Sequence, residues 1–233
     1  MAATLSQVMD LTQPFYHNAS FNPDLPMASI ELVRQIPNHG HSLEQLSLCT
    51  HVGTHMDAPA HVIETGAGVD EYPLERLRGT GIPVDLFTIG PDGPITERVL
   101  ASYADRLVPG TIALLCTGWG EQRGFTDSYI NHSPWLESSG AQWLADRGVI
   151  GVAIDHFSIA GRGPTEKVLP AHLILLGAGI WIVEEALLPR ALLERAAWHV
   201  VALPMRLRGA SGAPTRLVAY ALDAPAGRID ASR

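Results

Sequence analysis

One stretch of the chain holds three histidines and an aspartate within eleven residues, HVGTHMDAPAH at positions 51 to 61. These four titratable residues, His51, His55, Asp57 and His61, all have odd numbers. In an extended segment side chains alternate with a period of two, so all four would point to one face. A helix would stack His51 on His55 but turn Asp57 away, and Pro59 would interrupt its hydrogen bonds. The spacing therefore predicts a strand that runs into an irregular loop.

Imidazole nitrogens and a carboxylate oxygen on one face are ligands that zinc and manganese bind in proteins. Aligning so many titratable groups without a partner costs free energy, so we interpret the stretch as a divalent metal site. The residues alone also permit a polar strand edge with clustered histidines. For His61 they permit either a fourth metal ligand or a general acid and base, since an unperturbed imidazole has a pKa of about 6.5.

The stretch also resembles the HxGTHxDAPxH signature of the cyclase family of metal-dependent hydrolases, which includes bacterial kynurenine formamidases and isatin hydrolases. The resemblance implies that His51, His55 and Asp57 bind metal and that His61 is the proton donor and acceptor. It extends over nearly the whole chain. It further implies a swivelling β/β/α fold and a homodimer or homotetramer.

A second chemical cluster consists of His172 and Glu184 in PAHLILLGAGIWIVEEAL. The runs LILL and IWIV are predicted as short buried strands around the turn GAG, which would bring His172 beside Glu184 at one end of a hairpin. Glu185 should then face the other way. From the residues alone, a buried histidine beside a glutamate is commonly a satisfied structural pair. The resemblance implies instead that His172 and Glu184 complete a site for one or two ions, with Asp57 bridging where two are bound.

The N-terminal segment after a first short strand is dense in Pro, Asn and Ser, which predicts a loop. In the family that the chain resembles, this segment lies over the pocket and offers an aromatic residue to the substrate. Phe15, Tyr16 and Phe21 are therefore candidates, and we assign Tyr16 and Phe21 as substrate-binding residues. From the residues alone, each aromatic is more simply a packed core side chain.

Two further stretches carry polar residues of interest. The buried strand predicted over VIGVAID ends in AIDHFS, where the family reads GIDTxS. Asp155 and Ser158 match that pattern, and His156, in place of a small residue, is interpreted as a specificity contact. The residues from 118 to 134 lack apolar periodicity, and a stretch of that length predicts a functional loop or lid. His132 within it is expected to be a surface histidine.

Length and composition limit the remaining choices. A chain of 233 residues with 46% hydrophobic residues can form one domain over positions 1–233 with a substantial core. Its net charge of −8 argues against nucleic acid and anionic membranes as partners and leaves a small-molecule substrate. Two cysteines cannot make a disulfide framework, and the first residues lack a basic and an apolar region. A cytoplasmic protein is expected.

The remaining sequence alternates strands with short helices. Helices are predicted from Thr96 to Tyr103, over 139–147 and over 187–197. Strands are predicted over 30–36, 43–49, 82–87, 149–155, 198–207 and 211–224, and VPGTIALLCTGW (108–119) is predicted as a turn led by glycine into a buried strand that ends in TGW. The predicted fold class is α/β, a single domain with mixed, largely antiparallel sheets.

From the residues and the resemblance we predict a metal-dependent amidohydrolase of the arylformamidase type, which cleaves a C–N amide bond of a small aromatic or cyclic amide. Water bound to a divalent metal can have its pKa lowered to about 7, which makes hydroxide available at neutral pH. His61 would take the water proton and later give it to the leaving nitrogen. Three alternatives use the same site: a metal-dependent lyase or cyclase, a lactone hydrolase, and a metal-binding protein without catalysis.

Overall fold

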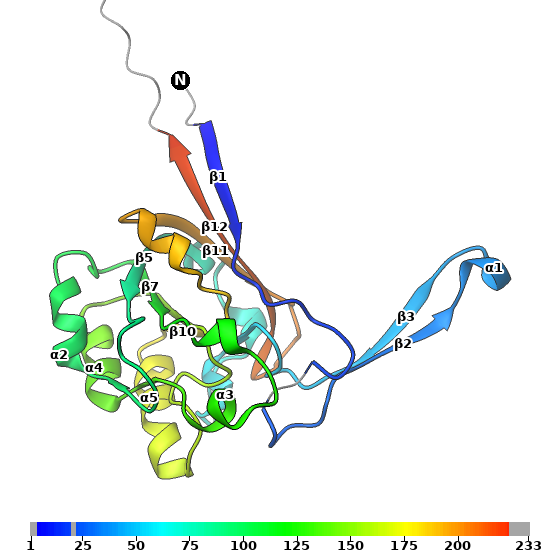
Figure 1. Ribbon diagram of the computed structural model, residues 1–233, viewed down its shortest axis with the longest axis horizontal. Helices are drawn as coiled ribbons and strands as arrows, with labels where there is room; N and C mark the ends of the chain where they lie inside the picture. Colours follow the sequence, from blue (N-terminus) through cyan, green and yellow to red (C-terminus); the bar gives the residue numbers. More distant parts are fainter. Residues whose placement is uncertain (1–3, 20–21, 224–233) are drawn as a thin grey trace, which may run out of the picture.

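One large sheet dominates the computed structural model, which describes residues 4–19 and 22–223 (Figure 1). Its eight strands follow the order β1-β12-β11-β5-β7-β9-β10-β4. A further pairing between β12 and β4 closes seven of them, all except β1, into a ring. The chain is thus a mixed α/β domain built on a barrel-like sheet. The strands span Thr4–Asp10 (β1), His55–Asp57 (β4), Arg78–Asp85 (β5), Thr111–Cys116 (β7), Gly151–Ile154 (β9), Trp181–Glu184 (β10), Trp198–Pro204 (β11) and Gly212–Asp223 (β12).

The centre of this sheet is parallel. Strands β5, β7, β9 and β10 pair in parallel, and β7, β9 and β10 are buried along their whole length. Strands buried on both faces read as continuous apolar runs, which is the pattern seen in the sequence. The other pairs in the sheet, which involve β1, β4, β11 and β12, are antiparallel. The sheet is therefore mixed, as predicted, with parallel strands at its centre rather than a largely antiparallel arrangement.

Alternation along the strands divides the core into two parts. Ile112, Trp181 and Val200 belong to a cluster inside the ring. Gly151 faces this cluster, and a Cβ there would lie 2.1 Å from the Trp181 ring, so only glycine permits the contact.

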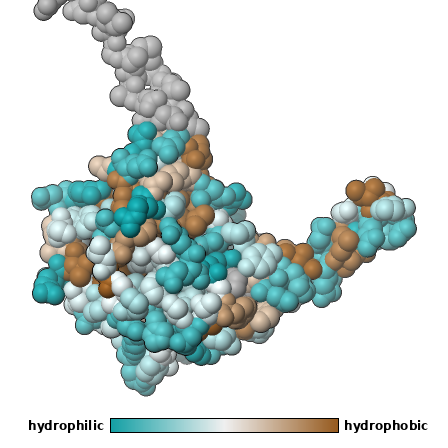
Figure 2. All heavy atoms as spheres, in the orientation of Figure 1, coloured by the Kyte–Doolittle hydropathy of each residue, from teal (hydrophilic) through white to brown (hydrophobic). Residues whose placement is uncertain are grey.

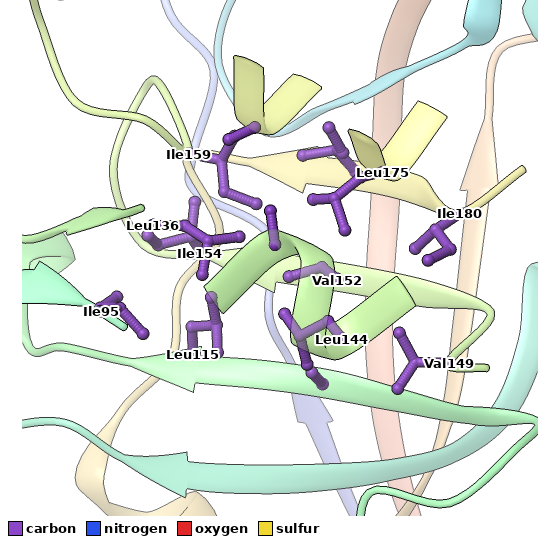
Figure 3. Packing of buried hydrophobic residues seen from close by; sticks show 14 of the residues in the cluster. Ile95, Leu115, Leu136, Leu144, Val149, Val152, Ile154, Ile159, Leu175 and Ile180 are labelled. Carbon is purple, nitrogen blue, oxygen red and sulfur yellow. The ribbon is translucent and has the colours of Figure 1, made fainter. Parts of the chain in front are cut away.

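Helices cover the outer face of the parallel strands. They are α2 (Glu97–Leu100), α4 (Ser138–Asp146) and α5 (Thr165–Gly177). Leu144 of α4 and Leu175 of α5 pack with strand residues such as Leu115 and Ile154 (Figure 3). This second cluster fixes α5 against the sheet.

Smaller elements complete the described residues. Strands β2 (Ser29–Arg34) and β3 (Leu43–Ser47) form an antiparallel hairpin with α1 (Ile36–His39) at its tip, and β6 (Pro94–Ile95) pairs in parallel with β8 (Trp135–Leu136). No described helix is long and apolar enough to cross a bilayer. The remaining helix α3 and the 3-10 turns span Asp127–Asn131 (α3), Pro59–His61 (η1), Val69–Glu71 (η2), Leu74–Leu77 (η3), Ala101–Tyr103 (η4), Trp119–Gln122 (η5) and Arg190–Glu194 (η6).

The hairpin predicted around GAG is wrong in its first half. The run LILL lies in helix α5, and only the run after Gly179 forms a strand, β10. The buried residues of the helix include Ala171, His172, Leu175 and Leu176, which recur at helical spacing. A short apolar run fits a buried helix and a buried strand equally well, so the apolar residues alone do not distinguish the two structures.

Two other predicted elements are shorter than expected. The extended segment from 51 to 61 contains only the three residues of β4, with a turn before it and the 3-10 turn η1 after it. The helix predicted over 187–197 is reduced to the 3-10 turn η6. It starts after Pro189, because proline disfavours helical backbone at the residue before it, and Trp198 already starts β11. The hairpin strands and β7, α4, β9, β11 and β12 are confirmed.

Candidate metal centre

Two short strands carry three of the predicted ligands. Antiparallel pairing of β4 with β10 places His55 opposite Glu184 and Asp57 opposite Ile182. Met56 packs inside the ring, so alternation directs His55 and Asp57 to the outer face, as it does Glu184. The side chains of all three ligands are buried there.

Helix α5 brings the fourth residue from the opposite side. The Nε2 atom of His172 lies 3.1 Å from Oε1 of Glu184 and 3.8 Å from Oδ2 of Asp57. Its Nδ1 atom lies 3.0 Å from the carbonyl oxygen of Val168 and must donate a proton to it, since a carbonyl only accepts. A neutral His172 therefore turns the lone pair of Nε2 toward the carboxylates.

His55 repeats this arrangement from the strand. Its Nδ1 atom donates to the carbonyl oxygen of Gly53 at 2.8 Å. Its Nε2 atom lies 3.4 Å from Oδ1 of Asp57 and 3.4 Å from Oε2 of Glu184. In metal sites, a ligating histidine commonly donates its other ring nitrogen to a backbone carbonyl in this way, which fixes the tautomer. Both histidines are therefore oriented as metal ligands.

His51 reaches the cluster through a turn. Gly53, with φ of +64°, reverses the chain between His51 and β4. The Nδ1 atom of His51 lies 2.8 Å from Oδ1 of Asp57, and its Nε2 atom lies 2.9 Å from Oγ of Ser211. Gly212 leaves room for the ring, because a Cβ at that position would lie 2.6 Å from Cε1 of His51.

The electrostatics of the cluster keep its acids ionised and its histidines basic. Burial opposes the charged form of His172, but the hydrogen bond to Glu184 and the charges of Glu184 and Asp57 outweigh it and raise its pKa to about 9. Burial likewise opposes ionisation of Asp57, yet the hydrogen bond with His51 and the nearby ring of His55 hold its pKa well below the usual range. The pocket thus favours positive charge between the carboxylates.

Two buried atoms at the centre of the cluster have no hydrogen-bond partner, Nε2 of His55 and Oδ2 of Asp57. Such atoms are costly unless an ion or a water satisfies them. The ligand atoms of His55, Asp57 and Glu184 all lie within 4.8 Å of one another, and the same holds for His51, Asp57 and His61. Asp57 is common to both groups. These donors fit one divalent ion, or two that share Asp57.

His61 occupies a different position from the other residues of the cluster. It ends the turn η1, which begins at Pro59, and it is the one exposed side chain among the six predicted site residues. Its ring centroid lies 4.0 Å from that of His51 and 5.6 Å from that of His172. Removal of water from around the ring lowers the pKa of His61, with a smaller opposing effect from Asp57. The lowered pKa favours the neutral imidazole, which is the form that accepts a proton.

The chain matches the model of the protein family described as "Putative cyclase" over residues 9–160, which is more than half of its length. The chain belongs to the cyclase family. It is 31% identical to a kynurenine formamidase of Salinibacter ruber over 187 residues, covering 76% of this chain and 79% of that protein. It is 32% identical to Cyclase-like protein 3 of Oryza sativa subsp. japonica over 75% of this chain, and spans 64% of that protein's length.

Solved structures in the cyclase fold superpose over most of the chain. An isatin hydrolase bound to the product analogue thioisatinate has a TM-score of 0.84 at 20% identity and covers 93% of both chains. At this identity the likeness concerns the fold alone. A predicted metal-dependent hydrolase from Bacillus stearothermophilus has a TM-score of 0.76 at 26% identity, covering 92% of this chain and 98% of that one.

A cavity of about 340 Å³ opens beside the cluster. His51, His61, His172 and Glu184 form its polar side. Its other walls come from four parts of the chain: the residues between β1 and β2, which we call the covering segment, the residue that follows η1, the loop after β9, and the first turns of α5. These walls are lined by Asn22, Leu25, Val62, Phe157, Ser158, Gly163, Thr165, Val168 and Leu169.

The predicted aromatic contacts do not line this cavity. Tyr16 is 46% exposed and its ring lies under the guanidinium of Arg123, at 5.8 Å. Phe15 packs against Gly53 and lines a separate cleft. Phe21 lies outside the described residues. The covering segment does reach the cavity, but through Asn22 and Leu25, because a reversal at Asn18 (φ +63°) separates them from Tyr16.

The other polar predictions fall into structural roles. His156 is fully buried against Tyr129 and Phe157, its Nε2 donating to the Tyr129 carbonyl at 2.9 Å, so it is no specificity contact. The region 118–134, predicted as a functional loop or lid, contains the two short elements η5 and α3, and its role as a lid stays a prediction. Asp155 accepts hydrogen bonds from Thr117 and Gly118 at the ends of the parallel strands.

Sequence reasoning missed two features beside the metal ligands. Glu185 does face away from Glu184, as predicted, and forms a buried ion pair with Arg123. Arg123 in turn donates to the carbonyl oxygens of Pro14 and Ala19, which ties the covering segment to β10. The second feature is Ser158, which lines the cavity. The sequence indicated only that Ser158 matches the family pattern GIDTxS. In the sequence, the one feature that could have indicated the role of Arg123 is its charge within the region 118–134, which lacks apolar periodicity.

Proposed function

We propose that the chain is a metal-dependent hydrolase that cleaves the C–N bond of a small aromatic or cyclic amide. One observation carries the proposal: two buried histidines, each with its Nδ1 atom on a backbone carbonyl, turn their Nε2 atoms toward two buried carboxylates, next to an exposed third histidine in a cavity. The likeness to kynurenine formamidases, and the fold shared with isatin hydrolases, support the reaction class.

The residues that would hold metal are His51, His55, Asp57, His172 and Glu184. Their nitrogen and carboxylate donors suit zinc or manganese, as one ion or two. A divalent ion in this position supplies a water of lowered pKa and polarises the substrate carbonyl. The protein's own contribution is to exclude solvent from the carboxylates and to fix the tautomers of His55 and His172 through backbone carbonyls.

His61 moves the proton. It lies on the cavity wall beside His51 and His172, and its lowered pKa favours the neutral ring. As general base it takes a proton from the attacking water, and as general acid it returns that proton to the leaving nitrogen. The return step is essential for an amide, because an unprotonated nitrogen is a very poor leaving group. A binding protein without catalysis has no use for this residue.

The cavity favours a substrate without formal charge. Among the described residues that line it, none is a lysine or an arginine. Arg162, near its rim, makes two hydrogen bonds to Asp24, at 3.0 and 3.2 Å, and Lys167 donates to the Arg162 carbonyl. Burying a carboxylate without a cation costs several kcal/mol, on the order of the penalty for any unpaired charge. We therefore propose isatin and simple aryl formamides as better substrates than N-formylkynurenine, which carries an amino acid group.

The test is hydrolysis by protein that has been stripped with a chelator and then restored with zinc or manganese. Isatin, formanilide and N-formylkynurenine are compared under the same conditions. Metal-restored turnover of either neutral amide, with kcat/KM at least tenfold above that for N-formylkynurenine, is expected. The reverse order would overturn the neutral-substrate proposal, and no turnover of all three by metal-loaded protein would remove amide hydrolysis. Consumption of water by the reaction separates hydrolysis from a lyase on the same site.

The same proposal includes a cytoplasmic location, which the small number of cysteines supports. It also includes a small-molecule substrate rather than nucleic acid or an anionic membrane as partner, which the acidic composition supports.

A further inference from the structure

Ser211, directly before β12, contacts the candidate metal centre through its hydroxyl group. Its Oγ atom lies 2.9 Å from Nε2 of His51. The backbone fixes this position, because the Ser211 carbonyl accepts a hydrogen bond from the amide of Ala58 at 2.9 Å and the next residue, Gly212, pairs with Asp57. A Cβ at position 212 would lie 2.6 Å from Cε1 of His51, so glycine permits the close approach. The pairing of β12 with β4 thus places the hydroxyl against the His51 ring.

The ring of His51 is oriented differently from the rings of the other two histidine ligands. His55 and His172 each donate from Nδ1 to a backbone carbonyl and turn Nε2 toward the carboxylates. His51 is reversed: its Nδ1 atom lies 2.8 Å from Oδ1 of Asp57, and its Nε2 atom faces Ser211. Nδ1 is therefore the nitrogen that His51 can offer to an ion beside Asp57.

The hydroxyl of Ser211 suits both neutral forms of this ring. With Asp57 as its partner, Nδ1 of His51 carries the ring proton, since a carboxylate only accepts, and Nε2 accepts a hydrogen bond from Ser211. With an ion as its partner, Nδ1 must present its lone pair, so the proton lies on Nε2 and is donated to Oγ of Ser211. One proton leaves Nδ1 and one is taken up at Nε2, so the number of ring protons is unchanged. A hydroxyl can take either role by rotating, whereas a backbone carbonyl only accepts.

We propose that Ser211 is a positioning residue of the metal centre, whose hydroxyl selects Nδ1 of His51 as the ligand atom and accepts the Nε2 proton once an ion is bound. Backbone carbonyls preset the tautomers of His55 and His172, but His51 changes its tautomer, and the rotating hydroxyl keeps Nε2 hydrogen-bonded in both states. Loss of such an outer hydrogen bond typically lowers metal affinity by about 10- to 100-fold. The inference rests on the metal centre of the proposed function and adds a residue to it.

The first experiment measures the zinc affinity of the full chain by competition with a chromophoric chelator. Ser211→Val and Ser211→Thr have the same shape, so the two variants differ in the hydroxyl group alone. Ser211→Val should weaken zinc binding by about tenfold or more, whereas Ser211→Thr should stay within about threefold of wild type. Ser211→Ala, which adds no atom, should show the same loss as Ser211→Val. Equal zinc affinity of Ser211→Ala and wild type, or of the Val and Thr variants, would overturn the proposal.

A double-mutant cycle shows whether the effect passes through His51. His51→Ala should itself lower zinc affinity, and adding Ser211→Ala should then lower it by less than about twofold more. The matched control is Ser102→Ala, which removes an exposed hydroxyl bonded to the Val99 carbonyl and should leave zinc affinity unchanged. Ser102 lies in η4, directly after α2, at an edge of the body where Figure 2 shows hydrophilic residues. An equal loss from Ser211→Ala with and without His51, or wild-type affinity of His51→Ala, would overturn the proposal.

Nuclear magnetic resonance of protein with isotope-labelled histidine identifies the protonated ring nitrogens directly. In zinc-loaded protein the proton is expected on Nε2 of His51 but on Nδ1 of His55 and His172. In zinc-free protein the His51 proton is expected on Nδ1, and the signals of this ring are those missing from His51→Ala. A proton on Nδ1 of His51 with zinc bound, or on Nε2 without zinc, would overturn the change of tautomer.

Hydrolysis of isatin by the same samples separates this inference from the proposed function. Wild-type turnover together with unchanged zinc affinity of Ser211→Val would overturn the role of Ser211 alone. Protein that shows the expected tautomers and affinities but hydrolyses no amide would support the role of Ser211 and remove amide hydrolysis.

Discussion

Glu184 and Glu185 are adjacent acids at the end of β10, and both are buried, but their surroundings differ. Glu184 lies beside His55 and Asp57, where buried atoms have no hydrogen-bond partner. Glu185 has a positive φ of 53° that turns it to the other side, where it pairs with Arg123. One acid thus belongs to a cluster whose donors fit an ion, and its neighbour belongs to an ion pair within the chain.

Glu184 and Glu185 differ in what compensates their burial, and this difference distinguishes a candidate metal ligand from a residue that stabilises the fold. Desolvated polar atoms are retained only where something compensates them. In the Glu185 pair the compensation is a guanidinium of the chain itself, and the pair joins β10 to the covering segment. In the Glu184 cluster, Nε2 of His55 and Oδ2 of Asp57 have no hydrogen-bond partner in the described chain, and the proposed ion would compensate them. Variants on the two sides of β10 should therefore fail in different ways.

The largest effect is expected from Asp57→Ala. Asp57 is common to both groups of ligand atoms, so its loss should weaken zinc binding by more than about a hundredfold and reduce turnover to background. Metal content by mass spectrometry and hydrolysis of isatin are measured on the same sample. A variant that retains zinc at wild-type stoichiometry would remove Asp57 from the ligand set.

His61→Ala should abolish most of the catalytic activity while leaving metal binding unchanged. Loss of a general acid and base lowers kcat by about 10²- to 10⁴-fold, while zinc content stays at the wild-type value. The control is His132→Ala, which removes a surface histidine paired with Asp92 and should leave both quantities unchanged. Loss of zinc from His61→Ala to the same degree as from Asp57→Ala would show instead that His61 is a ligand.

Arg123→Met should lower the stability of the fold without lowering zinc affinity. It leaves Glu185 buried without its cation, which lowers the free energy of unfolding by about 3 to 5 kcal/mol. Urea unfolding of the metal-free protein measures the loss, and zinc affinity of the folded fraction should change by less than about threefold. A fall in zinc affinity as large as that of Asp57→Ala would contradict the separation of the two sides.

The smallest effect is expected from His156→Gln, on the pH dependence of the free energy of unfolding. Burial lowers the pKa of this histidine to about 4, whereas the unfolded chain has a value of about 6.5. Its contribution is therefore fully present above pH 6.5 and is lost as the pH falls through about 4. His156→Gln should reduce the decline in unfolding free energy between pH 7 and pH 4.5 by roughly 2 kcal/mol. Parallel pH profiles for variant and wild type would contradict a neutral, buried His156.

Parity along a strand correctly predicted that His55 and Asp57 point to one face. His55 and Asp57 share a face because the three residues of β4 are extended. His51 and His61 join them for other reasons, a turn at Gly53 and the 3-10 turn that starts at Pro59. Neither reason is visible in the spacing. The sequence thus indicated the right cluster, although its geometry comes from tertiary pairing with β10 and β12.

The position of His172 shows where local patterns stop being informative. Its convergence with Glu184 was predicted through a hairpin, but a helix packed on a strand produces it. The short apolar run around His172 fits the periodicity of a helix and that of a strand equally well. Pro170 lies within the helix, and a proline there argues against a helix in the sequence. The hairpin of β2 and β3 was predicted, and its exposure depends on contacts that local patterns do not encode.

The most direct test of the metal centre is anomalous diffraction at the zinc absorption edge from crystals of the full chain grown with zinc. A strong peak is predicted among Nε2 of His55, Nε2 of His172 and the carboxylates of Asp57 and Glu184, with a second peak near His51 if two ions bind. Zinc found solely at exposed histidines such as His39 and His41, with none between β4, β10 and α5, would contradict the assignment.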